Sequence, residues 1–282
     1  RMGDLLELDA PSVQHRLKVI IDSKNLVLEN VYNQEPLSYD EIMEWCRSQA
    51  EFFKDYICDV GTLLGAAAGQ GKNILFEAQL GALRDIDYGI YPFTSSSNTI
   101  ASYAPIGAGI PGCALDNVVG VMKAYSTCVG EGPFVAETAM GEAWNEKLRE
   151  SGGEFGAATG RPRRVGPFDA VASRYGIRCQ KAQDIALTKL DVPGAFDKIP
   201  VITGYRLHGV LLDSFPTDSR LEEAEPVIEE LPGWECDISG CRSWKDLPEN
   251  ARKYVCTLEK LVDHPIYLVS TGAERDAYLL RE

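Results

Sequence analysis

The sequence predicts an α/β fold with a mainly parallel central sheet flanked by helices. Three short apolar segments, 73–76, 185–187 and 266–269, each pass directly into a polar or glycine-containing turn. Strands of an open parallel sheet end in this way at the edge where ligands bind. We therefore expect these segments to be parallel strands of one sheet, with their turns on one edge. The β-rich residues 201–230 predict a small antiparallel excursion, including a hairpin through Leu207-His208-Gly209.

Helices are expected before and between these strands. An amphipathic helix should run from Pro11 to about Tyr32, and a second should begin at Ser38, a good N-cap residue followed by acidic residues. The second helix runs toward Cys58, and a further helix ends at Gly69. Crossover helices are expected at about 115–121, 140–151, 167–178 and 248–262. Because no repeat or low-complexity linker interrupts the chain, residues 1–282 are expected to form one domain.

Composition excludes several classes of protein. The 282 residues are 45% hydrophobic and 25% charged, which is typical of a globular chain. A net charge of −14 disfavours nucleic acid and anionic membranes as partners, and no apolar run is long enough to span a membrane. Eight cysteines without a Cys-x-x-Cys pair, and only three histidines, indicate neither a zinc site nor a disulfide framework. Free thiols in a reducing cytoplasm are expected instead.

A glycine-rich, arginine-rich run from Gly153 to Gly166 stands out in this acidic chain. It contains Arg161, Arg163 and Arg164. Glycines allow backbone N–H groups to face a ligand, and the arginine fork matches carboxylate and phosphate oxygens in pairs. The run therefore predicts a local anion site. A solvated basic loop is the alternative interpretation.

The tetrapeptide Thr188-Lys189-Leu190-Asp191 follows a predicted strand and has the pattern by which GTP-binding proteins read guanine. Its aspartate accepts hydrogen bonds from the ring N–H and amine of guanine, and adenine would leave that carboxylate unpaired. The alternative is that Lys189 and Asp191 only end a strand at the surface. Gly107 to Gly112 matches a dinucleotide-binding string, but Pro111 and the lack of a preceding strand count against it.

Taken together, several segments resemble the adenylosuccinate synthetase family, and the resemblance extends over essentially the whole chain. They are 76–92, Ser95-Ser-Ser-Asn98-Thr, 123–127, Val129-Gly-Glu-Gly-Pro-Phe134, the loop 153–166, Leu187-Thr-Lys-Leu-Asp191-Val, Leu231-Pro-Gly-Trp234 and Ser270-Thr-Gly272. The resemblance implies a fold related to the P-loop GTPases and a cytoplasmic homodimer that uses GTP and Mg²⁺. It also implies ligation of IMP and L-aspartate, by phosphorylation of IMP at O6 and displacement of that phosphate by the aspartate amine.

Carried over residue by residue, the resemblance assigns ligand contacts but no catalytic residue and no metal ligand. The GTP-binding residues would be Arg163, Lys189, Asp191, Ser270 and Gly272. The IMP-binding residues would be Ser95, Val129 and Arg161. L-Aspartate would be bound by Thr159, Gly160, Arg161 and Arg163.

Departures from the family pattern also matter. The glycine-rich phosphate loop, the proposed base and acid, and most Mg²⁺ ligands belong to an opening third without a counterpart here. Leu80 stands in place of a glutamine, Ala158 in place of a threonine and Cys128 in place of an arginine. We therefore expect an N-terminally incomplete domain that is inactive alone. A non-catalytic nucleotide-binding or interaction relative with a degraded IMP site is the alternative, and a GTPase-like switch is disfavoured without a P-loop.

Overall fold

The structure is a computed structural model that describes residues 1–157 and 159–281. Its internal contacts group into two compact units. The first comprises residues 1–74 with 108–110, and the second comprises 75–107 with 111–282. The expectation that residues 1–282 form one domain stays a prediction.

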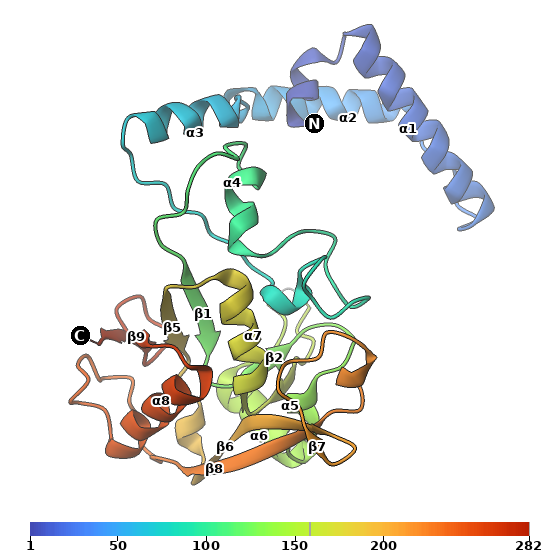
Figure 1. The fold of residues 1–282 in the computed structure, drawn as a ribbon. Helices are drawn as coiled ribbons and strands as arrows, with labels where there is room; N and C mark the ends of the chain where they lie inside the picture. The colour runs from blue at the N-terminus through green and yellow to red at the C-terminus, as the bar shows by residue number, and fades with distance from the viewer. Residues whose placement is uncertain (158, 282) are drawn as a thin grey trace. The chain divides into compact units, whose positions relative to one another are not determined.

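The first unit is helical (Figure 1). Its elements are a 3₁₀ turn η1 (Met2–Glu7), α1 (Pro11–Asn30), α2 (Tyr39–Phe53), a 3₁₀ turn η2 (Lys54–Tyr56) and α3 (Val60–Gly69). The expected start of the second helix is confirmed, because Ser38 Oγ accepts a hydrogen bond from the Glu41 backbone N–H at 3.4 Å. Leu8, Val13 and Met43 form a small buried cluster in this unit.

The second unit contains a four-stranded sheet in the order β1-β5-β9-β10 (Figure 1). Strands β1 (Val119–Lys123), β5 (Asp184–Thr188) and β9 (Ile266–Ser270) are parallel, and β10 (Tyr278–Leu280) is antiparallel to β9. The mainly parallel sheet is thus confirmed, as are the strands expected at 185–187 and 266–269.

A second sheet and a short ribbon carry the antiparallel part of the fold. Strand β6 (Lys198–Leu207) pairs in parallel with β4 (Phe168–Asp169), and antiparallel with β7 (Val210–Leu211) and β8 (Glu225–Pro232). Leu207 pairs with Val210, so the hairpin expected through His208 is confirmed. Strands β2 (Ser126–Cys128) and β3 (Arg164–Gly166) form a separate antiparallel pair.

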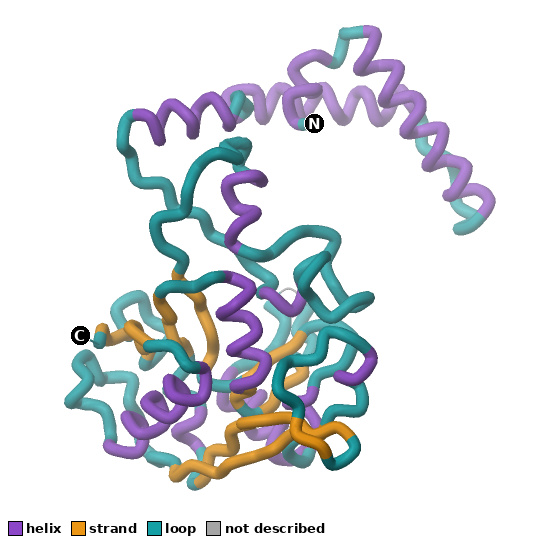
Figure 2. The backbone as a smooth tube through the Cα atoms, viewed as in Figure 1, coloured by secondary structure: helices purple, strands orange, loops and turns teal. Residues whose placement is uncertain are grey.

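Helices flank these strands or precede them along the chain, as the tube in Figure 2 shows. They are α4 (Ala104–Gly107), α5 (Val135–Thr138), α6 (Glu142–Gly152), α7 (Ala170–Gln180) and α8 (Glu249–Val262). The last three confirm the helices expected near 140–151, 167–178 and 248–262. Buried Asp169 caps α7, since its Oδ1 accepts from the N–H groups of Val171 and Ala172 at 3.0 Å each. None of the helices in the described chain is both long and apolar enough to cross a membrane.

Two expected elements are wrong. Residues 73–76 are not a strand: Leu75 is 91% exposed, and no strand among the described residues pairs with the segment. An apolar run becomes a strand only when a neighbour takes its backbone hydrogen bonds. Residues 115–121 are not a helix; they lead into β1, whose valines suit a strand that pairs with β5.

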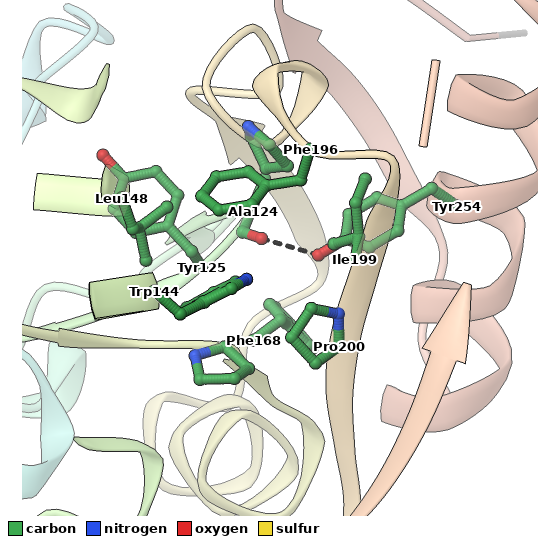
Figure 3. A pocket seen from close by; sticks show the side chains of 11 residues that line it. Ala124, Tyr125, Trp144, Leu148, Phe168, Phe196, Ile199, Pro200 and Tyr254 are labelled. Atoms are coloured by element: carbon green, nitrogen blue, oxygen red, sulfur yellow. Dashed lines mark hydrogen bonds between the residues drawn. The ribbon is translucent and has the colours of Figure 1, made fainter. Parts of the chain in front are cut away.

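The main core lies between the central sheet, α8 and the β4–β6 region, and it includes the fully buried Phe168, Leu187, Tyr254 and Leu258. A cavity of about 10 Å³ lies within it, in a region where Tyr254 donates a hydrogen bond to the Ala124 carbonyl (Figure 3). Its lining consists of Ala124, Tyr125, Trp144, Leu148, Pro167, Phe168, Pro193, Phe196, Ile199, Pro200 and Tyr254. A space of this size holds at most about one water molecule, so it is a packing gap and no ligand site.

Candidate functional site

The parallel strands β1, β5 and β9 end in polar residues at one edge of the central sheet. Lys123, at the end of β1, is in register with Thr188, at the end of β5. The Leu190 backbone N–H donates to the Ser270 carbonyl at the end of β9, at 3.2 Å. The turn 188–191 and the turn 270–272 therefore lie side by side at the carboxyl edge, where α/β sheets bind ligands.

The turn after β5 presents a buried carboxylate oxygen. Asp191 Oδ1 is buried and has no hydrogen-bond partner among the described residues. Leaving such an oxygen desolvated and unpaired is costly, so the position is suited to a donor supplied by a ligand. On the neighbouring turn, Ser270 Oγ donates to the Gly272 carbonyl at 3.0 Å. A Cβ on Gly272 would lie 3.2 Å from that of Ala277, so this turn is closely packed.

Glu154 lies at the centre of a cluster of cations. Its side chain is 1% exposed. Its Oε1 accepts hydrogen bonds from Lys123 Nζ at 2.8 Å and from the Tyr125 hydroxyl at 2.6 Å, and its Oε2 accepts from the Arg163 guanidinium at 2.9 Å. Lys189 Nζ lies 3.5 Å from Oε1 and donates to the Gly152 carbonyl at 2.5 Å. The predicted residues Arg163 and Lys189 are thus brought together by a carboxylate that the sequence analysis did not single out.

The electrostatics of this cluster favour the ionised carboxylate. Burial acts to raise the pKa of Glu154, but hydrogen bonds from Lys123 and Tyr125 and the charges of Lys123 and Lys189 outweigh it and lower the pKa to about 2. Burial also lowers the pKa of Lys123 and raises that of Tyr125. Three cations surround one anion, so this small region is positive although the whole chain is strongly acidic.

The glycine-rich loop is a short, hairpin-like excursion. Phe155 bridges Pro162, the Gly156 N–H donates to the Arg161 carbonyl at 2.8 Å, and the Gly160 N–H donates to the Gly156 carbonyl at 2.7 Å. Gly160 has φ of 65°, a left-handed conformation that favours glycine.

The tip of this loop holds three of the four predicted aspartate contacts; the fourth, Arg163, pairs with Glu154. Thr159, Gly160 and Arg161 are exposed there, with Thr159 Oγ1 accepting from the Arg161 N–H at 3.3 Å. Ala158, the departure from the family pattern, lies outside the described residues.

Arg84 joins the segments that hold two of the three predicted IMP contacts, Ser95 and Val129. Its guanidinium donates to the Phe93 carbonyl and to the Val129 carbonyl, the latter at 2.9 Å. The Ser95 N–H in turn donates to the Arg84 carbonyl at 2.8 Å. Ser95 and Val129 are therefore brought into one neighbourhood. Val129 is 69% exposed, so only its backbone has an anchoring contact there.

Strand β2 links the IMP neighbourhood to the cation cluster. Lys123 Nζ donates to Thr127 Oγ1 at 3.0 Å, and Arg84 donates to the sulfur of the next residue, Cys128, at 2.8 Å. Cys128 is also paired across the ribbon with Arg164, which donates to the Gly132 carbonyl at 2.8 Å. The loop 129–134 is thus held from two sides by arginines. Within residues 1–157 and 159–281, no group of three or more His, Cys, Asp or Glu side chains is arranged to hold a metal ion.

Comparison with known proteins decides the family. A family model described as "Adenylosuccinate synthetase" matches residues 1–279. The chain belongs to the adenylosuccinate synthetase family. An adenylosuccinate synthetase of Trichlorobacter lovleyi is 46% identical over 281 residues, which are 99% of this chain and 64% of that protein. One of Pelobacter propionicus is 44% identical with the same coverage.

A solved structure agrees with this assignment. The structure titled "fully ligated Adenylosuccinate synthetase from Plasmodium falciparum" has a TM-score of 0.87 and 32% identity, and the match covers 95% of this chain and 63% of that one. The chain therefore spans about 64% of the length of the curated adenylosuccinate synthetases that it matches.

Sequence reasoning missed the residues that organise this candidate site. All of them, Arg84, Lys123, Tyr125 and Glu154, lie inside segments that carried the resemblance, but none was singled out. One signal could have pointed to Glu154. An acidic residue at the start of an arginine-rich loop is suited to pair with a cation of that loop, and Arg163 is its partner here.

Proposed function

We propose that this chain provides the guanine-, IMP- and aspartate-binding part of an adenylosuccinate synthetase. That enzyme would join IMP to L-aspartate, with GTP phosphorylating O6 of IMP before the aspartate amine displaces the phosphate. The observation that carries the proposal is the buried Asp191 oxygen in the turn after β5, beside Lys189 and the turn 270–272, for which the described residues offer no hydrogen-bond partner. The match of the family model to nearly the whole chain supports it.

The described side chains suggest a division of roles. Asp191 would accept the ring N–H and amine of guanine, with Lys189 on one side of the base and Ser270-Thr-Gly272 on the other. Arg163 has a buried Nε with no hydrogen-bond partner among the described residues, and this donor would serve an anionic oxygen of GTP or aspartate. Positive groups held in place before the reaction stabilise the charge that develops in phosphoryl transfer.

The remaining ligands would bind beside this cluster. The exposed tip with Thr159, Gly160 and Arg161 would bind the aspartate carboxylates, and Arg161 would also reach IMP. Ser95 and Val129, joined by Arg84, would line the IMP site. The described residues include no cluster of His, Cys, Asp or Glu side chains that could hold Mg²⁺. We further propose that the protein acts in the cytoplasm and forms a homodimer. Light scattering on the purified chain would test the dimer by its molar mass.

A titration of GDP and ADP tests the guanine site directly. The wild type should bind GDP at least tenfold more tightly than ADP, even if its affinity is only about millimolar. Asp191→Asn should lose this preference, because the amide would face the guanine donors with a donor of its own. Asp213→Asn, a charge-matched change at an exposed aspartate, should keep it. Equal GDP and ADP affinities in the wild type would contradict the proposal.

The second candidate function is a non-catalytic nucleotide-binding relative. Cys128 favours it, since a thiol stands where the family has an arginine, and its sulfur is a contact of Arg84. A coupled assay for adenylosuccinate with IMP, L-aspartate and GTP can exclude one of the two candidates. We expect no turnover by this chain alone, and measurable turnover would exclude the non-catalytic candidate.

A further inference from the structure

We propose that Glu154 is a positioning residue that couples the proposed guanine-reading turn, residues 188–191, to the glycine-rich loop, residues 153–166. The inference rests on the proposed function, because it assumes that Lys189 serves guanine and Arg163 serves the anionic ligands. Glu154 itself is buried and would affect ligand binding through these two side chains.

The contacts of Glu154 come from separate parts of the fold. Oε1 receives Lys123 from the end of β1 and Tyr125 from the segment that follows it. The same oxygen faces Lys189 in the turn after β5, while Oε2 receives Arg163 from the segment before β3. An ionised carboxylate only accepts hydrogen bonds and has about four acceptor positions. Lys123, Tyr125 and Arg163 donate to three of them, and Lys189 adds an ion pair.

Charge explains why one carboxylate is needed at this point. Lys123, Arg163 and Lys189 would repel one another in a partly buried region without an anion between them. Glu154 compensates one of these three charges and the nearby Asp191 carboxylate compensates a second, which leaves an excess of one positive charge for an anionic ligand. Because the donors share one acceptor, a shift of Lys189 also changes the environment of Arg163.

The backbone of Lys189 supplies an independent observation. Its φ is 60°, a left-handed conformation that is unfavourable for a residue with a Cβ. The end of the side chain is fixed by the Gly152 carbonyl and by Glu154. Asp191 follows two residues later, so the conformation at Lys189 sets where the guanine-reading carboxylate lies. Removing Glu154 should therefore loosen the turn without removing any group that contacts guanine.

The test is a double-mutant cycle on GDP affinity in the full chain, with Glu154→Gln, Lys189→Met and the double variant. Glu154→Gln should weaken GDP binding about tenfold and keep the preference over ADP, because Asp191 is intact. If Glu154 acts through Lys189, the double variant should bind GDP about as weakly as Lys189→Met alone. Glu150→Gln, at an exposed position of α6, should leave GDP affinity unchanged.

The outcomes separate this inference from the proposed function. Additive losses in the cycle, or an unchanged GDP affinity in Glu154→Gln, would overturn the positioning role while the GDP preference of the wild type still stood. A wild type that does not distinguish GDP from ADP would overturn both. If circular dichroism shows that Glu154→Gln is unfolded, Glu154→Asp takes its place in the cycle. This variant keeps the charge, so a smaller loss with the same non-additivity is expected, and additivity again contradicts the inference.

Discussion

Replacement of Glu154 by glutamine should change how the stability of the protein depends on pH. The folded-state pKa of Glu154 is about 2, below the ordinary value of 4.5. A carboxyl group with a depressed pKa in the folded state stabilises the fold when it is ionised. Its contribution is therefore complete above the unfolded pKa and is lost as the pH falls toward the folded pKa.

The size of the effect follows from the two pKa values. A shift of one pKa unit corresponds to about 1.4 kcal/mol, so the depression of Glu154 corresponds to about 3 kcal/mol of unfolding free energy near neutral pH. The side chain is 1% exposed, so solvent screening takes little from this figure. Linkage places somewhat less than half of this loss between pH 6 and pH 3.5, and most of the remainder at lower pH.

Urea unfolding followed by the fluorescence of the four tryptophans measures this dependence. The difference in unfolding free energy between the wild type and Glu154→Gln should be about 3 kcal/mol at pH 6 and clearly smaller at pH 3.5. Glu150→Gln controls for the loss of an exposed carboxylate. A difference between the wild type and Glu154→Gln that stays constant over this pH range would refute the argument that Glu154 is stabilised as an anion.

Two further predictions concern stability away from the cation cluster. A Cβ on Gly166 would lie 2.1 Å from the Ala136 carbonyl oxygen, so Gly166→Ala should lower the unfolding free energy by about 3 kcal/mol. The control is Gly240→Ala, where a Cβ would have nothing within 4 Å, and it should change the unfolding free energy by less than about 1 kcal/mol. Comparable urea midpoints for the two variants would contradict this prediction. The Tyr205 hydroxyl donates a hydrogen bond to the buried Asp169 carboxylate at 2.5 Å. Tyr205→Phe should therefore lower the unfolding free energy by about 2 kcal/mol. A thermal midpoint equal to that of the wild type would show that this hydrogen bond makes no net contribution to stability.

Elements with local signals could be predicted from the sequence. Ser38 begins α2 because its hydroxyl accepts a backbone N–H, and the hairpin at His208-Gly209 turns where both residues adopt positive φ. The strand expected at 73–76 could not be judged in this way, since a strand depends on a partner elsewhere in the chain. The helix expected at 115–121 failed for a related reason, because pairing with β5 decided the conformation of its valines.

The candidate site was predictable in its parts but not in its assembly. Residue type and order pointed to Lys189, Asp191 and Arg163, since a guanine-reading carboxylate and an arginine fork have recognisable local patterns. The sequence did not show that Glu154 would lie between Lys189 and Arg163, because that contact depends on how β1, β5 and the loop before β3 pack. Buried pairing of distant charges is a property of the tertiary structure, and a single sequence carries no direct signal of it.

The order of the central sheet also bears on when the site can form during synthesis. Strand β5 lies between β1, more than 60 residues earlier, and β9, nearly 80 residues later. A nascent chain that has emerged only as far as α8 already carries Lys123, Glu154, Arg163 and Lys189, yet β5 has one open edge and Leu190 lacks its acceptor at Ser270. The cation cluster can assemble on such a chain before the turn 270–272, the second side of the proposed guanine site, exists. Ribosome-bound chains should therefore gain selectivity for guanine only after the last strands, β9 and β10, have left the exit tunnel.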